Sequence, residues 1–207
     1  VERGEMWNSI LEILEEKVRE GVEVRVMYDG MCCLMLLPYS YPKTLREKGI
    51  KCKMFSPIRP ALSTHQNNRD HRKICVIDGH TAFTGGVNLA DEYINRKVRF
   101  GHWKDTAVMV EGDAAVGFTM MFLQMWGVTE QEKERYESYL KPADYRLPKD
   151  ADASGFVIPY GDSPLDKENV GEQVYLDILG HAKKYVHIMT PYLILDDQMI
   201  NALQYSA

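Results

Sequence analysis

In residues 5–20, apolar and charged positions alternate in the pattern of a helix with one apolar face. The apolar stripe recurs every three to four positions, at Ile10, Leu11, Ile13, Leu14 and Val18. This spacing predicts an amphipathic helix that ends at Gly21. In the next run, VEVRVMYDG, valines stand at every second position, so a strand is expected to follow the helix.

A second helix and strand follow the first pair. Residues 44–49, TLREKG, suit a short helix closed by glycine, and IKCKMFSP at 50–57 alternates again. Residues 71–84 contain two strand-like runs, HRKICVI and HTAFT, separated by the turn pair Asp78-Gly79. Two helix–strand units followed by a hairpin predict a layered α/β domain, with a mixed sheet flanked by helices.

Three further elements are predicted after the hairpin: a helix at 89–96, a strand at 106–112 and a helix at 114–126. The methionine and aromatic residues of the last helix are expected to pack in the core, because flexible thioether side chains fill irregular gaps well.

The rest of the chain begins with a charged, proline-containing stretch of little periodicity, which is typical of a linker. It is followed by a helix, the strand-like run VHIMTPYLI at 186–194, and a final helix that resembles the first one, which suggests an internal duplication. We therefore predict a first domain at residues 1–129, a linker at 130–163 and the start of a second domain at 164–207.

The composition is that of a globular protein, with 45% hydrophobic residues among 207. The longest apolar run, residues 31–38, is far shorter than the roughly 20 residues of a membrane-spanning helix. No signal peptide is expected, because the first residues lack its basic and apolar segments. The four cysteines form no C-x-x-C pair, which favours reduced thiols over a zinc site or a disulfide framework.

Charge is distributed unevenly along the chain, whose net formal charge is −5. Residues 43–73 contain nine Lys or Arg residues and only two acidic residues. Such a basic stretch suits an anionic substrate or an anionic membrane surface, while the overall acidity argues against a general nucleic-acid binder. A solvated face with clustered lysines explains the same pattern, and charge alone does not separate the two interpretations.

The candidate chemistry lies in the stretch NRDHRKICVIDGHTAFTGGVN. Residues two apart on a strand share a face, so His71 and Lys73 are expected to project together. A neutral imidazole can attack phosphorus and form a phosphohistidine, and a nearby ammonium neutralises the charge that develops on the phosphate oxygens. His65, His71 and His80 match no familiar metal-ligand spacing, so neither a metal nor another cofactor is expected.

The residues after this pair each have a structural explanation beside a functional one. Asp78 stands in a favoured Asp-Gly turn pair. Gly85 and Gly86 allow close approach of a ligand to the backbone, or a positive φ. Asn88 either caps the next helix or offers its amide to a phosphate at the N-terminus of that helix.

The order His71-x-Lys73, four residues, Asp78, six residues, Gly85-Gly86-x-Asn88 resembles the signature of the phospholipase D superfamily. Other runs, among them WKDTAVMVEGDAAVGFTMMFLQMW and VHIMTPYLILDDQMINAL, are similar to bacterial cardiolipin synthases. The resemblance covers nearly the whole chain apart from the linker. It implies a phospholipase D-like layered sandwich of two similar halves around a shared site, of which this chain holds the first half and the start of the second.

The resemblance also implies a reaction that needs no metal. Cardiolipin synthases convert two phosphatidylglycerol molecules into cardiolipin and glycerol through a phosphohistidine, and the second histidine of the site protonates the leaving alcohol. By matching position, His71 is one of these imidazoles, Lys73 and Asn88 contact the phosphate beside the Gly86 backbone, and Asp78 is an orienting acid. Which half supplies the attacking histidine stays open.

Only one complete motif is present. The triplet His181-Ala182-Lys183 lies in a predicted helix, and neither the acid nor the glycine pair of the motif follows it. The chain is therefore expected to be an inactive, soluble fragment of a longer enzyme at the cytoplasmic face of a bacterial cell membrane, anchored by segments outside this chain. Its expected partners are phosphatidylglycerol, an anionic membrane surface and the missing second half of the parent chain.

Two alternatives stay open at this point. A phosphodiesterase or nuclease with a single motif would build one site from a homodimer in which two copies of His71 face each other, although the acidity of the chain disfavours nucleic acid. A non-catalytic module would hold anionic lipid head groups with the basic stretch at 43–73, and its binding would weaken with salt.

Overall fold

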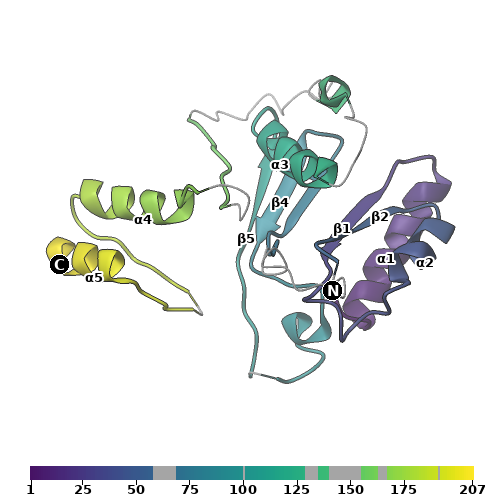
Figure 1. The fold of residues 1–207 in the computed structure, drawn as a ribbon, viewed down its shortest axis with the longest axis horizontal. Helices are drawn as coiled ribbons and strands as arrows, with labels where there is room; N and C mark the ends of the chain where they lie inside the picture. Colours follow the sequence, from purple (N-terminus) through teal and green to yellow (C-terminus); the bar gives the residue numbers. More distant parts are fainter. Residues whose placement is uncertain (58–68, 100, 129–134, 140–154, 163–166, 191) are drawn as a thin grey trace. The chain divides into compact units, whose positions relative to one another are not determined.

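The computed structural model describes residues 1–57, 69–99, 101–128, 135–139, 155–162, 167–190 and 192–207. They belong to two compact units, Val1–Ile158 and Pro159–Ala207 (Figure 1). Among the described helices, none is both long enough and apolar enough to cross a bilayer.

In chain order, the described part of the first unit forms α1 (Glu5–Arg19), β1 (Arg25–Asp29), α2 (Tyr41–Glu47), β2 (Lys51–Phe55), β3 (Ile74–Ile77), β4 (Thr81–Gly85), the 3-10 helix η2 (Asp91–Ile94), β5 (Ala107–Glu111), α3 (Ala115–Gly127) and the 3-10 helix η3 (Tyr136–Tyr139). The combination of helices and strands confirms the predicted α/β class. The described strands form a parallel pair and a separate antiparallel sheet, and not the single mixed sheet that the sequence predicts.

The first layer consists of α1, β1, α2 and β2, as the sequence predicts. β1 and β2 are parallel neighbours, and α2 lies on the crossover that connects them. α2 begins three residues earlier than expected because Pro42 fits the first turn of a helix. Both helices contribute to one buried core, which contains Trp7, Val24, Tyr28, Cys33, Leu37, Tyr41, Leu45, Ile50 and Cys52.

A residue from far along the chain completes the N-terminus of α1. Gly4 precedes this helix and has no side chain that could cap it. The Asp91 carboxylate accepts hydrogen bonds from the backbone N–H groups of Met6 and Glu5, at 2.9 and 3.0 Å. These two bonds lower the pKa of Asp91, and they attach η2 to the first layer.

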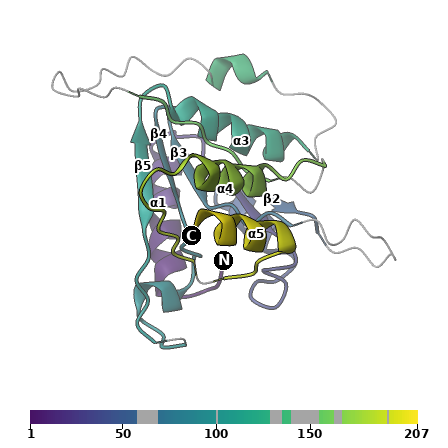
Figure 2. The same cartoon turned by 90° about the vertical axis from the view of Figure 1, so that its left-hand side faces the viewer.

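The second layer is the antiparallel sheet β3–β4–β5 with α3 on one face (Figures 1 and 2). The predicted hairpin is confirmed, and its two strands are β3 and β4. Ala82, Ala115 and Phe118 form a small buried core between the sheet and α3. On the other face of the sheet, Ile77, Phe83 and Met109 are exposed.

The helix predicted at 89–96 is wrong in length, because only the four residues of η2 form a helical turn. Asn95 adopts a left-handed φ of 58°, which ends the turn. Its side chain donates to the carbonyl oxygen of Trp103 at 2.9 Å and accepts from the Trp103 backbone N–H at 2.6 Å. This local pairing replaces the hydrogen bonds that a longer helix would have made.

The second unit contains α4 (Val170–His181) and α5 (Asp197–Ser206). Asp196 caps α5 by accepting a hydrogen bond of 2.9 Å from the Met199 backbone N–H. The strand predicted at 186–194 is not formed over the residues that the structure describes there. A strand needs a neighbour for its ladder, and Met189 and Ile194 are instead exposed.

The linker predicted at 130–163 lies largely outside the described residues. In its described part, the Tyr136 hydroxyl donates to the carbonyl oxygen of Leu123 at 3.2 Å, and the Tyr139 hydroxyl accepts from Arg25 at 2.5 Å. These contacts attach η3 to α3 and β1. The predicted domain boundaries at 129 and 164 stay predictions.

Candidate functional site

A cleft of about 530 Å³ lies in the first unit, at the end of β1 and the start of β3. One wall comes from the end of β1 and the loop after it, and another comes from residues 70–75. Residues 83–85, residues 87–90 and the side chains of Met121, Phe122 and Met125 on α3 also line it. Since apolar side chains dominate and charged groups of both signs converge in it, the cleft suits a ligand with both apolar and polar parts.

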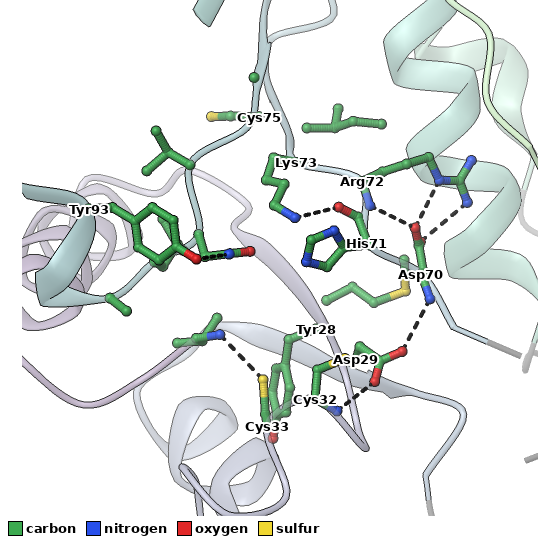
Figure 3. Close-up of a pocket in the computed structure, with 18 of the residues that line it drawn as sticks. Tyr28, Asp29, Cys32, Cys33, Asp70, His71, Arg72, Lys73, Cys75 and Tyr93 are labelled. Carbon is green, nitrogen blue, oxygen red and sulfur yellow. Dashed lines mark hydrogen bonds and ion pairs between the residues drawn. The ribbon is translucent and has the colours of Figure 1, made fainter. Parts of the chain in front are cut away.

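His71 and Lys73 both line this cleft, and Figure 3 shows their side chains next to each other. The sequence predicts both residues within a strand, and this placement is wrong: the regular strand begins only at Ile74, so His71 and Lys73 stand on the segment before β3. Lys73 Nζ donates a hydrogen bond of 2.7 Å to the carbonyl oxygen of His71. This bond holds the ammonium group beside the residue that carries the imidazole.

The surroundings lower the pKa values of both groups. Partial removal from water, followed by the charge of Lys73, lowers the pKa of His71 from 6.5, and Asp29 opposes the shift. Desolvation lowers the pKa of Lys73 to about 8, and Cys32 and Asp70 oppose it. At neutral pH the imidazole is therefore mainly neutral while the ammonium is mainly charged.

The buried carboxylate of Asp29 joins two walls of the cleft (Figure 3). Its Oδ1 accepts hydrogen bonds from the backbone N–H groups of Met31 and Cys32, at 3.0 and 2.9 Å. Its Oδ2 accepts a bond of 3.1 Å from the backbone N–H of Asp70. Because a buried carboxylate is stable only with such donors, Asp29 holds the loop after β1 against the segment that carries His71.

The neighbours of His71 bind each other. Arg72 Nε donates to Asp70 Oδ1 at 2.9 Å, and Arg72 Nη2 donates to Asp70 Oδ2 at 3.2 Å. A bidentate pair of this kind has a fixed geometry. The charge of Arg72 is thus largely compensated by Asp70, and the pair stiffens the backbone on both sides of the imidazole.

The glycine pair makes room for neighbouring backbone and for Asp105. Neither Gly85 nor Gly86 has a positive φ. A Cβ atom on Gly86 would lie 2.8 Å from Asp105 Oδ1, and one on Gly85 would lie 3.0 Å from the Thr106 carbonyl oxygen. Gly85 lines the cleft and Gly86 does not. The close approach at Gly86 is therefore to Asp105, whose charge also acts on Lys73.

Asn88 lines the cleft and does not cap a helix. Ala90 precedes η2, and no side chain caps that turn. The Asn88 side-chain amide donates a hydrogen bond to the Tyr93 hydroxyl, which also borders the cleft (Figure 3). This partner orients the amide, so the alternative in which Asn88 caps the next helix is not realised.

Asp78 lies in the turn between β3 and β4, outside the lining of the cleft. Asp78 and Gly79 have φ values of 52° and 72°, and the His80 backbone N–H donates to the Ile77 carbonyl oxygen at 3.2 Å. Two successive positive φ values are what a type I′ turn requires. This placement at the opposite end of β3 from His71 favours the turn-forming role of Asp78.

No group of three His, Cys, Asp or Glu residues within the described ranges could hold a metal ion. His80 also lies in the turn, where its Nδ1 is 2.8 Å from Thr81 Oγ1. His65 lies outside the described residues.

Sequence reasoning missed Asp29, Asp105 and Tyr93 as neighbours of the cleft. Asp29 looked like an ordinary strand end, yet polar residues at the carboxyl ends of parallel strands often border a site. Asp105 in the run WKD precedes a strand and carries no spacing signal of its own. Tyr93 belonged to a helix that the structure shortens.

A protein-family model described as "Cardiolipin synthase, PLD-like domain" matches residues 7–126, which is more than half of the chain. An uncharacterized protein of Streptococcus mutans serotype c is 58% identical over 207 residues, which are all of this chain and 44% of that protein. Proteins named cardiolipin synthase from Alkalihalophilus pseudofirmus and Halalkalibacterium halodurans are 36% and 34% identical over 208 aligned residues, with all of this chain and 40% of each relative covered.

The chain thus spans less than half the length of these relatives. No solved structure matches it significantly. The family match includes both layers of the first unit and the whole motif from His71 to Asn88. The predicted phospholipase D-like α/β fold class is confirmed, and the chain belongs to the cardiolipin synthase family of phospholipase D-like domains.

Proposed function

We propose that this chain supplies one half of the active site of a phosphatidyltransferase that converts two phosphatidylglycerol molecules into cardiolipin and glycerol. The observation that carries the proposal is that His71 and Lys73 lie side by side in one cleft of mixed apolar and charged lining. The similarity to proteins named cardiolipin synthase over the full length of this chain supports it.

The first chemical step is an attack on phosphorus. The neutral His71 imidazole donates its nitrogen lone pair to the phosphorus of one phosphatidylglycerol, and a P–N bond forms as the P–O bond to the glycerol head group breaks. The leaving oxygen takes a proton from a general acid and departs as glycerol. Lys73 stabilises the negative charge that grows on the phosphate oxygens in the transition state.

The second step regenerates the imidazole. A hydroxyl of the second phosphatidylglycerol attacks the phosphohistidine, so that a P–O bond forms, the P–N bond breaks and the hydroxyl proton passes to a base. The product is cardiolipin. The lowered pKa of His71 supports this role, because a protonated imidazole has no lone pair for the attack.

Among the other residues of the motif, one is proposed to contact the phosphate and two to act on the site indirectly. Asn88 lines the cleft with its amide oriented by Tyr93, and we propose that it donates to a phosphate oxygen. Asp78 and Gly86 act indirectly, through the β3–β4 turn and through the space that Gly86 leaves for Asp105.

The general acid is proposed to be a histidine outside this chain, in the second half of the longer protein. We do not assign this role to His181. It is the last residue of α4, its side chain is exposed, and its Nδ1 lies 3.1 Å from Oδ1 of Asp177. The chain alone is therefore expected to be inactive. The complete protein is expected to act at the cytoplasmic face of a bacterial membrane that contains phosphatidylglycerol.

The proposal is tested by cardiolipin and glycerol formation from phosphatidylglycerol vesicles, with the complete protein and its His71→Ala variant. Loss of the nucleophile in His71→Ala should lower the rate at least about 10³-fold. His181→Ala is the matched control, because it removes the histidine of another His-x-Lys triplet, and its rate should stay within about twofold of the wild type.

Phosphatidylglycerol labelled with ³²P separates chemistry from folding. The wild-type protein should retain label in an acid-labile, base-stable form, as expected of phosphohistidine, and His71→Ala should retain none. Cardiolipin formation that survives His71→Ala would refute the proposal. Hydrolysis of simple phosphodiesters without any cardiolipin would instead favour a nuclease-like phosphodiesterase.

A further inference from the structure

The loop that follows β1 exposes an unusual number of apolar side chains. Residues 31–39 read MCCLMLLPY and contain no charge. Met35 is 91% exposed. The other large apolar side chains exposed on this loop are Met31, Leu34, Leu36 and Tyr39. Single exposed apolar residues are ordinary, but five on one nine-residue loop are costly in water.

This apolar loop, defined as residues 31–39, is fixed to the first layer by buried side chains and backbone hydrogen bonds. Cys33 and Leu37 are buried in the core of the first layer. The Leu37 backbone N–H donates to the Cys33 carbonyl oxygen at 2.8 Å, and the Leu34 backbone N–H donates to the Met31 carbonyl oxygen at 3.1 Å. The two buried side chains anchor the loop from below while the exposed ones stay outside.

The apolar loop is also part of the rim of the cleft. Cys32, Cys33 and Leu36 line the cleft together with His71 and Lys73. The Asp29 carboxylate binds the start of the loop through Oδ1 and the segment before His71 through Oδ2 (Figure 3). The position of the loop and the position of the reactive segment are therefore set by the same side chain.

The charge around the loop favours an anionic surface. Residues 30–46 contain no Asp or Glu, and they end with Lys43 and Arg46 on α2. Lys43 is largely exposed, and its Nζ lies 3.9 Å from the likewise exposed carboxylate of Glu47, a surface pair that leaves the ammonium open to other anions. A cationic side chain beside an apolar patch can bind lipid phosphates while the patch enters the acyl region.

We propose that the apolar loop inserts into the surface of an anionic phospholipid bilayer and sets the mouth of the cleft against the membrane. This inference rests on the proposed function, because only a few bonds separate the phosphodiester of phosphatidylglycerol from its acyl chains. A lipid whose acyl chains stay in the bilayer can bring its phosphorus to His71 only if the rim of the cleft touches that bilayer. The uncharged, anchored loop is the part of the rim that can bury apolar side chains there.

The test measures partition of the complete 207-residue chain onto vesicles of equal parts phosphatidylglycerol and phosphatidylcholine, at 0.15 M and 0.5 M salt. Full burial of one large aliphatic side chain changes such an equilibrium by about tenfold. Leu34→Ser with Met35→Ser should therefore lower the partition coefficient at least about tenfold, and part of the wild-type binding should persist at high salt. Val108→Ser with Met109→Ser on β5 is the matched control, since it also removes two exposed apolar side chains and should change binding less than twofold.

A single-site probe gives a second readout. Met35→Trp should show a blue-shifted emission with these vesicles and quenching by lipids brominated on the acyl chains, whereas Met109→Trp should show neither. His71→Ala should bind vesicles like the wild type, so that a failure of the catalytic proposal is distinguishable from a failure of this one.

Three results would overturn the inference: equal losses in the loop and β5 variants, no quenching of Met35→Trp, or wild-type binding that vanishes completely at 0.5 M salt. A loop variant that converts a dimer into a monomer in sedimentation, with unchanged vesicle binding, would identify a second copy of the chain as the occupant instead.

Discussion

The two layers of the first unit differ in how completely their apolar residues are buried. In the first layer, Trp7, Leu45 and Ile50 are fully buried between two helices and a parallel strand pair. In the second layer the core is small, and one face of the sheet leaves Phe83 and Met109 exposed. The first layer therefore supplies most of the packing stability, and the second carries the residues with candidate chemistry.

This difference shows how a reactive segment can be positioned without being packed. His71 and Lys73 precede the regular part of β3, where no ladder fixes them. Asp29 stands at the end of the well-packed β1. Its carboxylate accepts a hydrogen bond from the Asp70 backbone N–H, just before His71, so it holds this segment of the second layer against the first layer. Polar contacts, and not core packing, hold the candidate site together.

The largest expected change in stability comes from a substitution that creates a cavity in the first layer, and it tests whether that layer is the better packed of the two. Leu45 is 0% exposed, so Leu45→Ala should lower the free energy of unfolding by about 2–5 kcal/mol. Val108 is 54% exposed in the second layer, and Val108→Ala should cost less than about 0.5 kcal/mol. Urea unfolding of both variants measures the difference, and equal costs would show that the two layers are equally well packed.

A smaller effect is expected at Gly86, where the second layer is locally tight. The added methyl group of Gly86→Ala would lie 2.8 Å from Asp105 Oδ1 and must displace that carboxylate, at a cost of about 1–3 kcal/mol. The transferase activity of the complete protein should fall as well, because Asp105 acts on Lys73.

Gly180→Ala is the control for this substitution. A Cβ atom there meets nothing within 4 Å, and the residue lies inside α4, so alanine should add about 0.5–1 kcal/mol of helix stability. If Gly86→Ala is as well tolerated as Gly180→Ala in thermal unfolding, the close approach between Gly86 and Asp105 is not what requires the glycine.

The smallest effect is electrostatic and has a defined pH window. Folding lowers the pKa of Lys73 from 10.5 to about 8, so between these values the unfolded chain retains a proton that the folded chain has released. The free energy of unfolding of the wild type should therefore rise with pH across this interval. Below pH 8 the full penalty applies, and Lys73→Met should then be more stable by about 1 kcal/mol after screening by solvent.

The difference between Lys73→Met and the wild type should shrink as pH rises from 8 to 10.5, while the variant loses transferase activity at every pH. Lys43→Met, at an exposed position, should leave stability within about 0.5 kcal/mol at all pH values. Urea titrations at pH 7, 9 and 10.5 check both. A Lys73→Met variant that is less stable than the wild type at pH 7 would mean that the ammonium stabilises the fold.

Much of the fold could be predicted because its local signals are strong. The apolar stripe around Leu11 and Leu14 and the alternation before Asp29 each place an element within a few residues of its observed bounds. The helix at 89–96 failed because Asn95 pairs with Trp103, which no periodicity reveals. The strand at 186–194 failed because apolar alternation alone supplies no hydrogen-bonding neighbour.

For the candidate site, the sequence alone was sufficient to choose the residue types: an imidazole and an ammonium two positions apart, followed by a turn, a glycine pair and an amide. Spacing along one short stretch carries that information, because neighbours in the chain stay neighbours in space. Only the tertiary structure decided that Asp29 binds the backbone before His71 and that Asp105 lies where a side chain on Gly86 would be. It also decided that the apolar loop borders the cleft. Those relations join residues far apart in the chain, and the packing of the two layers determines their distances.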